Sequence, residues 1–269
     1  MSPGDMKQIL DRLPTIPSIP IVISEALNII DNPKSNINQL SEVISKDISL
    51  SGQILKLVNS AYYGFPSQIT TINKAMALLG FNKVKSIILS VAVKPMMMSY
   101  CGKSVWEHSI KCAVASQTIA RSLGVAKTDE AFVMGLLHDI GKMLFVIYNS
   151  DKLNEVNRLV GLGADRLTAE RMMFGFTHTE IGQELVARWK LPLIIQNCVR
   201  YHHKPQDSSN KTMVGVVYVA DRVTQEQLTY PILDPDIADV LDFDIPDPMT
   251  LRDNVITASQ AILDALAKT

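Results

Sequence analysis

The residues of this chain that could carry chemistry are concentrated in its second half. All five histidines lie between positions 108 and 203 of the 269-residue sequence. They are His108, His138, His178, His202 and His203. Neutral imidazoles and carboxylates from separate helices are the side chains with which helical bundles bind first-row transition metals. The histidines therefore indicate a metal site, provided that the fold brings them together.

His108 lies on the apolar face of a helix that is predicted to begin at Ser104. Val105, Cys112 and Ile119 share this face because their positions follow helical spacing. A lone histidine in such a place is usually a core residue whose nitrogens have hydrogen-bond partners. His108 alone therefore has a structural explanation as well as a functional one.

The dipeptide His138-Asp139 follows an apolar run, residues 132–137, and should be largely buried. Burying an ionised aspartate beside an imidazole is costly unless another charge compensates it, and a cation would do so. Lys142 lies one helical turn after His138, where its ammonium could hold a phosphate oxygen. The alternative for Lys142 is a solvated side chain.

His178, His202 and Asp221 also lie on the apolar faces of predicted helices, and His203 is adjacent to His202. Without a metal, burial of so many titratable groups would cost desolvation energy that nothing visible offsets. The sequence therefore predicts a site for one or two divalent transition metal ions, namely iron, manganese or zinc. Its predicted ligands are His108, His138, Asp139, His178, His202, His203 and Asp221.

Helices must position these side chains, because apolar residues recur at helical spacing along nearly the whole chain and no alternating pattern indicates a sheet. The predicted fold is all-α, a helical bundle. The predicted helices lie between Pro20 and Pro33 and at about 36–45, 48–60, 71–80, 82–95, 104–123, 128–138, 151–160, 166–173, 178–190, 192–203 and 211–226, with a last helix ending near Lys268.

Composition excludes several classes of protein. The net charge is -1 and the basic residues are scattered, which argues against nucleic-acid binding. The three cysteines form no closely spaced pair, as is typical of a reducing compartment. The N-terminus has no signal-peptide pattern, and the apolar run Ile87 to Val93 is far shorter than the roughly 20 residues of a membrane span. We therefore expect a cytoplasmic protein without a membrane partner.

The order of these residues resembles the HD superfamily of metal-dependent phosphohydrolases, and more closely its HDOD branch of bacterial signalling domains. The first half contributes the segments LPTIPSIP, SKDISLSGQILKLVNSAYYG and INKAMALLGFNKVKSIIL. The second half contributes GLLHDIGK, ERMMFGFTHTEIGQELVARWKLP and RYHH. The resemblance covers about residues 13–205 and extends to VADRV around Asp221.

The resemblance implies two groups of metal ligands that share one carboxylate. The first ion would be held by His108, His138, Asp139 and Asp221. The second would be held by His178, His202 and His203, with Asp139 bridging. Lys142 matches the lysine that the related HD-GYP phosphodiesterases use near the phosphate, so the resemblance implies catalytic roles for Lys142 and Asp139.

Two departures from the HD-GYP pattern limit the inference. His203 is followed by KPQDSSN, which lacks the GYP signature, and Ser104 occupies the place where trinuclear sites have a glutamate. We therefore do not expect a third metal ion, and the resemblance to HD-GYP proteins does not imply specificity for cyclic di-GMP. The expected organisation is an N-terminal helical lobe at 1–100, an HD-like lobe with the metal site at 101–226, and a C-terminal linker and helix at 227–269.

Three functions agree with these features. The HDOD branch implies a signalling or regulatory protein, whereas the complete ligand set favours a metal-dependent phosphohydrolase acting on a nucleotide or cyclic dinucleotide. Oxygen chemistry at a di-iron site is the third. We favour signal transduction with a retained metal site, with a signalling protein or a small phosphorylated ligand as partner. Tyr62, Tyr63 and Phe65 are predicted to form either an exposed contact surface or a buried plug.

Overall fold

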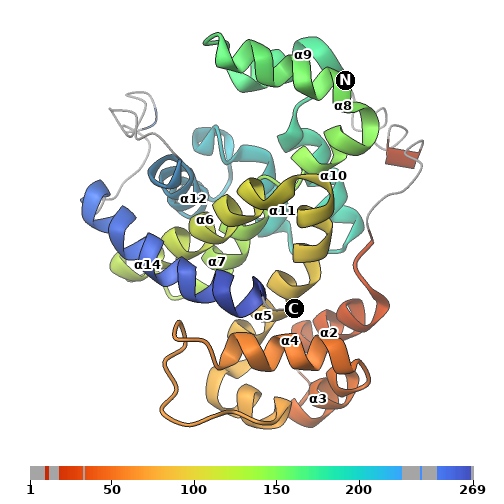
Figure 1. Cartoon of the computed structure of the whole chain (residues 1–269), viewed down its shortest axis with the longest axis vertical. Coiled ribbons are helices and arrows are strands. Elements are labelled where there is room, and N and C mark those ends of the chain that lie inside the picture. Colours follow the sequence, from red (N-terminus) through yellow and green to blue (C-terminus); the bar gives the residue numbers. More distant parts are fainter. Residues whose placement is uncertain (1–9, 12–17, 33, 226–236, 238–246, 268–269) are drawn as a thin grey trace.

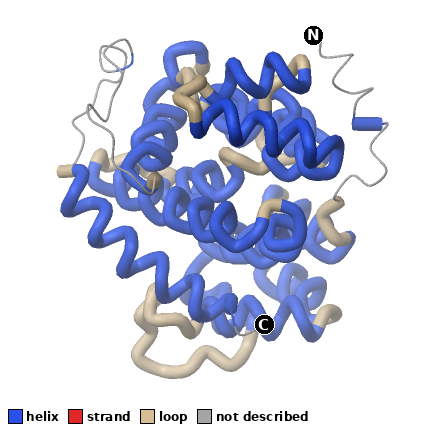
Figure 2. Tube along the Cα trace, turned by 45° about the horizontal axis from the view of Figure 1, so that its top comes forward, coloured by secondary structure: helices blue, strands red, loops and turns tan. Residues whose placement is uncertain are grey.

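The computed structural model describes residues 10–11, 18–32, 34–225, 237 and 247–267. All regular structure in these residues is helical and they contain no strand (Figures 1 and 2), which confirms the predicted all-α fold. The first half contains α2 (Ile21–Asp31), α3 (Ile37–Ser45), α4 (Ile48–Val58) and α5 (Ile72–Tyr100). The second half contains α6 (Gly102–Ser122), α7 (Thr128–Leu137), α8 (Lys142–Gly161), α9 (Arg166–Phe174), α10 (His178–Arg188), α11 (Leu193–Tyr201), the short 3-10 helix η1 (Pro205–Asp207), α12 (Lys211–Thr224) and α14 (Pro248–Ala267).

Side-chain caps explain why several of these helices begin where they do. Asn36 and Gln39 form a capping box at the start of α3, and Thr177 and Glu180 form another at the start of α10. Each box satisfies backbone N–H groups that have no partner inside the helix. The Thr177 box matters for function, because it fixes the first residue of α10, which is His178.

Three predicted boundaries differ from the observed ones. Gly80 has a left-handed φ of 77° and interrupts α5 as expected, but the helix continues through Pro95 to Tyr100 instead of ending near Pro95. Helix α8 begins at Lys142, nine residues before the predicted start, and has non-helical backbone angles at Asn149. Ser104 lies inside α6, whose N-cap is Cys101. The predicted Pro- and Asp-rich stretch at 231–248 falls largely outside the described residues.

The long helix α5 joins the two halves of the chain. Its first part packs with α2, α3 and α4, while it also contacts α6, α7 and α8 (Figure 1). Helix α14 returns along α6 and reaches α4, so the C-terminal segment packs on both halves. Tyr62, Tyr63 and Phe65, in the loop between α4 and α5, are half-buried against this core. They are therefore neither a fully exposed surface nor a fully buried plug.

Two helices, α5 and the segment 128–161, are long and apolar enough by composition to cross a membrane. Their most apolar windows are 56% and 78% buried inside the fold. Packing against other helices therefore accounts for their apolar character as well.

Glycines allow the close approach of the backbones that carry the histidines. A Cβ at Gly135 of α7 would lie 2.6 Å from the backbone oxygen of Cys112 on α6, so α7 contacts α6 directly. A Cβ at Gly141 would lie 1.9 Å from the backbone oxygen of His178 at the start of α10. These two glycines bring the turn after His138 against both neighbouring helices.

Replacing Gly141 by alanine should therefore destabilise the protein. Its methyl group would collide with backbone, which cannot rotate away, so we expect a loss of about 3 kcal/mol or more in the free energy of unfolding. Gly52→Ala is the matched control, because a Cβ there meets nothing within 4 Å and α4 would gain helix propensity. Denaturant unfolding of both variants checks this, and equal stability of the two would contradict the packing described.

Candidate metal centre

Asp139 lies at the centre of the predicted site, and its two carboxylate oxygens face different histidines. Oδ2 lies 3.3 Å from Nε2 of His138 and 4.0 Å from Nε2 of His108. Oδ1 lies 3.2 Å from Nε2 of His178 and 3.7 Å from Nε2 of His202. A carboxylate with one oxygen toward each of two ligand groups has the arrangement needed to bridge two ions.

The first ligand group comes from three helices that meet at the centre of the second half. His108 lies on α6, His138 directly follows α7, and Asp221 lies on α12. Oδ1 of Asp221 is 3.0 Å from Nε2 of His108 and 3.7 Å from Nε2 of His138. One ligand atom from each lies within 4.8 Å of the others, close enough to hold a single ion.

The second ligand group joins the ends of α10 and α11 to Asp139. His178 is the first residue of α10, and His202 and His203 follow the last residue of α11. Nε2 of His178 is 3.4 Å from Nε2 of His202 and 3.3 Å from Nε2 of His203. The ligand atoms of these three residues and Asp139 again lie within 4.8 Å of one another. The structure thus brings all seven predicted ligand residues together.

Hydrogen bonds on the far side of the rings orient the imidazoles toward the centre. Nδ1–H of His138 donates to the carbonyl of Gly135 at 2.8 Å, and Nδ1–H of His202 donates to the carbonyl of Val199 at 3.1 Å. A carbonyl oxygen can only accept, so these bonds place the ring proton on Nδ1. In the neutral form of each ring the lone pair is then on Nε2, which points into the site, as in known metal-binding histidines.

Glu170 is a functional candidate that the sequence reasoning missed. Its carboxylate is fully buried on α9 and lies 2.7 Å from Nδ1 of His178. It also accepts a hydrogen bond from the backbone N–H of His178 at 2.9 Å. The signal was present in the sequence, since Glu170 shares the buried face of α9 with Phe174, where a carboxylate needs a partner.

The local electrostatics favour the metal-binding form at three of the ligands, His202, His203 and Asp139. Burial and the neighbouring His178 lower the pKa of His203 to about 4. Burial, together with His203, also lowers the pKa of His202 well below its usual value. Although burial opposes ionisation of Asp139, the Lys142 ammonium and His138 hold the pKa of its carboxyl well below the usual range. Although burial opposes protonation, neighbouring groups raise the pKa of His138 and of His178, so a metal ion bound there would displace a proton from each ring.

Two atoms in the site lack the hydrogen-bond partner that buried polar atoms normally have. They are Nε2 of His138 and Oδ1 of Asp139, and both are shielded from solvent. Leaving such atoms unsatisfied costs stability, whereas coordination of a cation would satisfy both. The residues present therefore fit a divalent transition metal.

A cavity of about 470 Å³ opens onto this centre and is rich in cations. Lys111, Lys142 and Arg166 line it together with His108 and Asp221. Lys142 is not the solvated side chain of the alternative explanation, because its Nζ lies 2.5 Å from Oδ2 of Asp139 and the side chain is only 24% exposed. The remaining lining residues are Ser104, Glu107, Val160, His203, Thr224 and Gln225.

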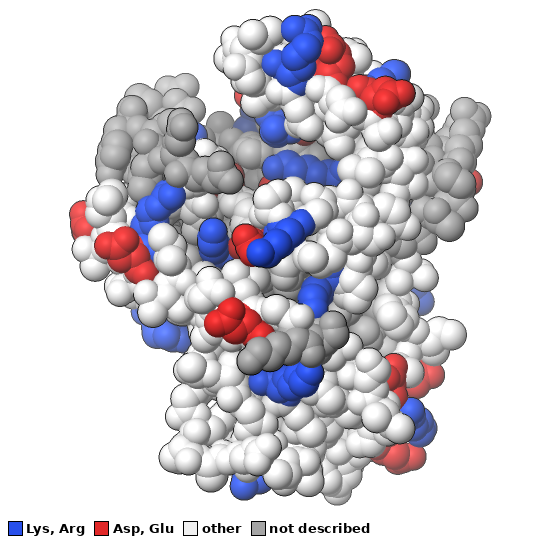
Figure 3. All heavy atoms as spheres, viewed as in Figure 1, with Lys and Arg blue, Asp and Glu red and all other residues white. Residues whose placement is uncertain are grey.

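This concentration of positive charge is local. On the face of the molecule that Figure 3 shows, basic and acidic side chains are interspersed and do not gather into one patch of a single sign.

Comparisons with known proteins agree with the geometry. The family profile of the HDOD domain matches residues 16–205. An uncharacterised protein of Treponema pallidum (strain Nichols) is 28% identical over 201 residues, which are 72% of this chain but only 39% of that protein. The chain therefore spans about two fifths of the length of this relative.

Two solved structures share the fold. A candidate phosphohydrolase from Shewanella amazonensis SB2B superposes with a TM-score of 0.79 at 24% identity, covering 97% of both chains. A candidate signal transduction protein from Marinobacter aquaeolei VT8 superposes with a TM-score of 0.75 at 18% identity, covering 98% of this chain and 65% of the other. At these identities the likeness concerns the fold alone.

Glu170→Gln tests the contribution of the carboxylate behind His178. The amide preserves the shape but removes the charge that orients and polarises the imidazole, so metal affinity should fall by about 10- to 100-fold. Glu155→Gln on the exposed side of α8 is the control and should leave affinity unchanged. Competition of each variant with a metal-sensitive dye measures its metal affinity. Equal affinities of Glu170→Gln and the wild type would show that Glu170 does not contribute to metal binding.

Proposed function

The chain belongs to the HDOD domain family, and we propose that it is a signal-transduction protein whose retained metal centre recognises a phosphorylated ligand. The proposal includes one or two divalent ions of iron, manganese or zinc, held by the seven residues of the candidate centre. A separate signalling protein would supply the input or receive the output.

The observation that carries this proposal is the position of Asp139 between two groups of histidines. A buried carboxylate needs compensating charge, and two ions would supply it on both sides. In such a centre the metal ions would polarise phosphate oxygens and lower the pKa of a bound water. A fold that merely descended from an enzyme would not need both ligand groups to converge.

The cations around the cavity support a phosphorylated ligand. Lys111, Lys142 and Arg166 come from α6, α8 and α9, so three helices direct positive charge toward one space beside the ligands. Lysine and arginine are the side chains that bind phosphate oxygens, arginine through two parallel hydrogen bonds and lysine as a point charge.

Signal transduction is supported by the family and by the way the fold is connected. Ligand residues of the centre lie on or next to α6, α7, α10, α11 and α12, so a ligand bound there would contact most of the second half of the fold. Side-chain caps hold the starts of α10 and α12, and close glycine contacts hold α7 against α6 and the turn after His138 against α10. A bound ligand could therefore alter the surface that a partner protein contacts.

Hydrolysis of the phosphorylated ligand is the second candidate, and Lys142 favours it. Its ammonium lies beside Asp139 at the mouth of the centre, where negative charge would gather on a phosphoryl group during hydrolysis. An ammonium preorganised at that place stabilises the transition state more than the ground state.

Lys142→Ala distinguishes the two candidates. If the centre hydrolyses phosphate esters, turnover of a generic phosphodiester or of a cyclic dinucleotide should fall by about 10- to 1,000-fold at equal metal content, since loss of one preorganised electrostatic contact has this effect. Lys74→Ala, an exposed position on α5, is the control.

Activity that is equal in wild type, Lys142→Ala and Lys74→Ala would exclude a lysine-assisted hydrolase. Absence of turnover in all three, together with saturable binding of a phosphorylated ligand to the wild type, is the result expected of a signalling protein. Failure of cyclic dinucleotides, (p)ppGpp and nucleotides to bind the metal-loaded protein would contradict the proposed ligand.

A further inference from the structure

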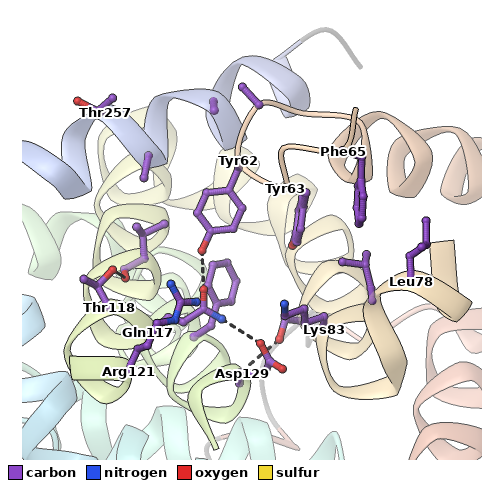
Figure 4. A pocket seen from close by; sticks show the side chains of 17 residues that line it. Tyr62, Tyr63, Phe65, Leu78, Lys83, Gln117, Thr118, Arg121, Asp129 and Thr257 are labelled. Atoms are coloured by element: carbon purple, nitrogen blue, oxygen red, sulfur yellow. Dashed lines mark hydrogen bonds between the residues drawn. The ribbon is translucent and has the colours of Figure 1, made fainter. Parts of the chain in front are cut away.

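A second cavity, of about 580 Å³, lies where the two halves of the fold meet and is separate from the metal centre. Figure 4 shows its construction. The loop between α4 and α5 supplies Tyr62, Tyr63 and Phe65 on one side, and Gln117 and Arg121 extend from α6 on the other. The rest of the lining comes from the same loop and α6 and from α5, α7 and α14, and none of the seven candidate metal ligands belongs to it.

A chain of hydrogen bonds crosses this cavity. The hydroxyl of Tyr62 donates to Oε1 of Gln117 at 2.6 Å, and Nε2 of Gln117 donates to Oδ1 of Asp129 at 2.9 Å. The backbone of Asp129 is also fixed, because the hydroxyl of Ser86 donates a hydrogen bond to its carbonyl oxygen at 3.2 Å. The amide of Gln117 is thereby fixed in one orientation, and no donor among the described residues bonds to the second carboxylate oxygen of Asp129.

The other groups in the cavity are aromatic rings and two cations. Tyr62 and Tyr63 pack edge to face with their ring centroids 5.1 Å apart, and Phe65 and Phe132 add two further rings. Lys83 and Arg121 are near enough to Asp129 to oppose the rise that burial causes in its pKa. Neither cation forms a hydrogen bond or ion pair with another residue in the part of the chain that the structure describes.

From this combination we propose that the cavity binds a nucleotide, that is, a planar nitrogen heterocycle carrying a phosphate. The aromatic rings would pack against the heterocycle. The unused carboxylate oxygen of Asp129 would accept from an amino group of the base, and Arg121 with Lys83 would bind the phosphate. A purely apolar ligand would leave both cations and the second carboxylate oxygen of Asp129 without a hydrogen-bond partner.

The cavity is also placed to act on the metal centre. Gln117 and His108 lie nine residues apart on α6, and Asp129 precedes His138 by nine residues along α7, a distance of about 14 Å in a helix. Two of the helices that line the cavity, α6 and α7, therefore also carry or lead to ligands of the first group. A nucleotide bound here would be a regulatory ligand, although the binding itself does not depend on the function proposed for the metal centre.

Calorimetric titration of the full chain with AMP and GMP tests the proposal, after metal has been removed with a chelator so that the metal centre does not bind phosphate through its ions. Wild type should bind at least one of the two nucleotides. Adenosine, which lacks the phosphate, and ribose 5-phosphate, which lacks the ring, should each bind at least 10-fold more weakly than AMP or GMP.

Arg121→Gln should weaken nucleotide binding by about 10-fold or more, because it removes a charged hydrogen-bond donor from an exposed position without disturbing the core. Arg158→Gln, on the exposed side of α8, is the control and should leave binding unchanged, whereas loss of binding in Lys142→Ala would show that the nucleotide occupies the metal centre. The proposal is overturned if neither nucleotide binds at millimolar concentration. It is also overturned if Lys142→Ala weakens nucleotide binding and Arg121→Gln does not.

Discussion

The fold around the metal centre depends on one buried charge, the carboxylate of Asp139. The side chain is 2% exposed, so its ionised form persists only because Lys142 and the surrounding histidines compensate it. Three of the neighbouring histidines, His138, His202 and His178, are in turn oriented by a bond on the far side of the ring, to the carbonyl of Gly135, the carbonyl of Val199 and the carboxylate of Glu170 respectively. This outer layer makes the centre a preorganised constellation, in which the ligands need little rearrangement to bind a metal.

Close backbone packing is what allows this constellation to form. Gly135 and Gly141 flank the His138-Asp139 pair and leave no room for a Cβ against α6 and α10. The capping box at Thr177 then fixes the first residue of α10, so that His178 reaches Asp139 from the opposite side. The same two helices, α6 and α7, extend from the metal centre to the cavity at the junction of the two halves, which gives the fold a short physical connection between two places where ligands would act.

Helical periodicity and spacing were sufficient to predict the all-α fold and the residues that converge, because His108, His178 and His202 lie on apolar stripes that a helix must turn inward. Spacing could not predict which oxygen of Asp139 faces which histidine, since this depends on how separate helices pack. It also missed the early start of α8, where Lys142 opens the helix and pairs with Asp139, and it missed Glu170, whose partner is eight residues further along the chain. The sequence did not predict the second cavity either, because five separate segments line it and their packing cannot be derived from spacing. Only its aromatic residues stood out in the sequence.

The central claim is that Asp139 stands between two metal ligand groups, and diffraction from crystals soaked in manganese would test it most directly. Anomalous scattering locates each ion independently of the protein density. The account predicts manganese at one or both of two places, bound either by His108, His138 and Asp221 or by His178, His202 and His203. Each ion should also contact Asp139. In His138→Ala, the ion beside His108 and Asp221 should be absent. Absence of anomalous density at both places in the wild-type protein, at saturating manganese and neutral pH, would contradict the account.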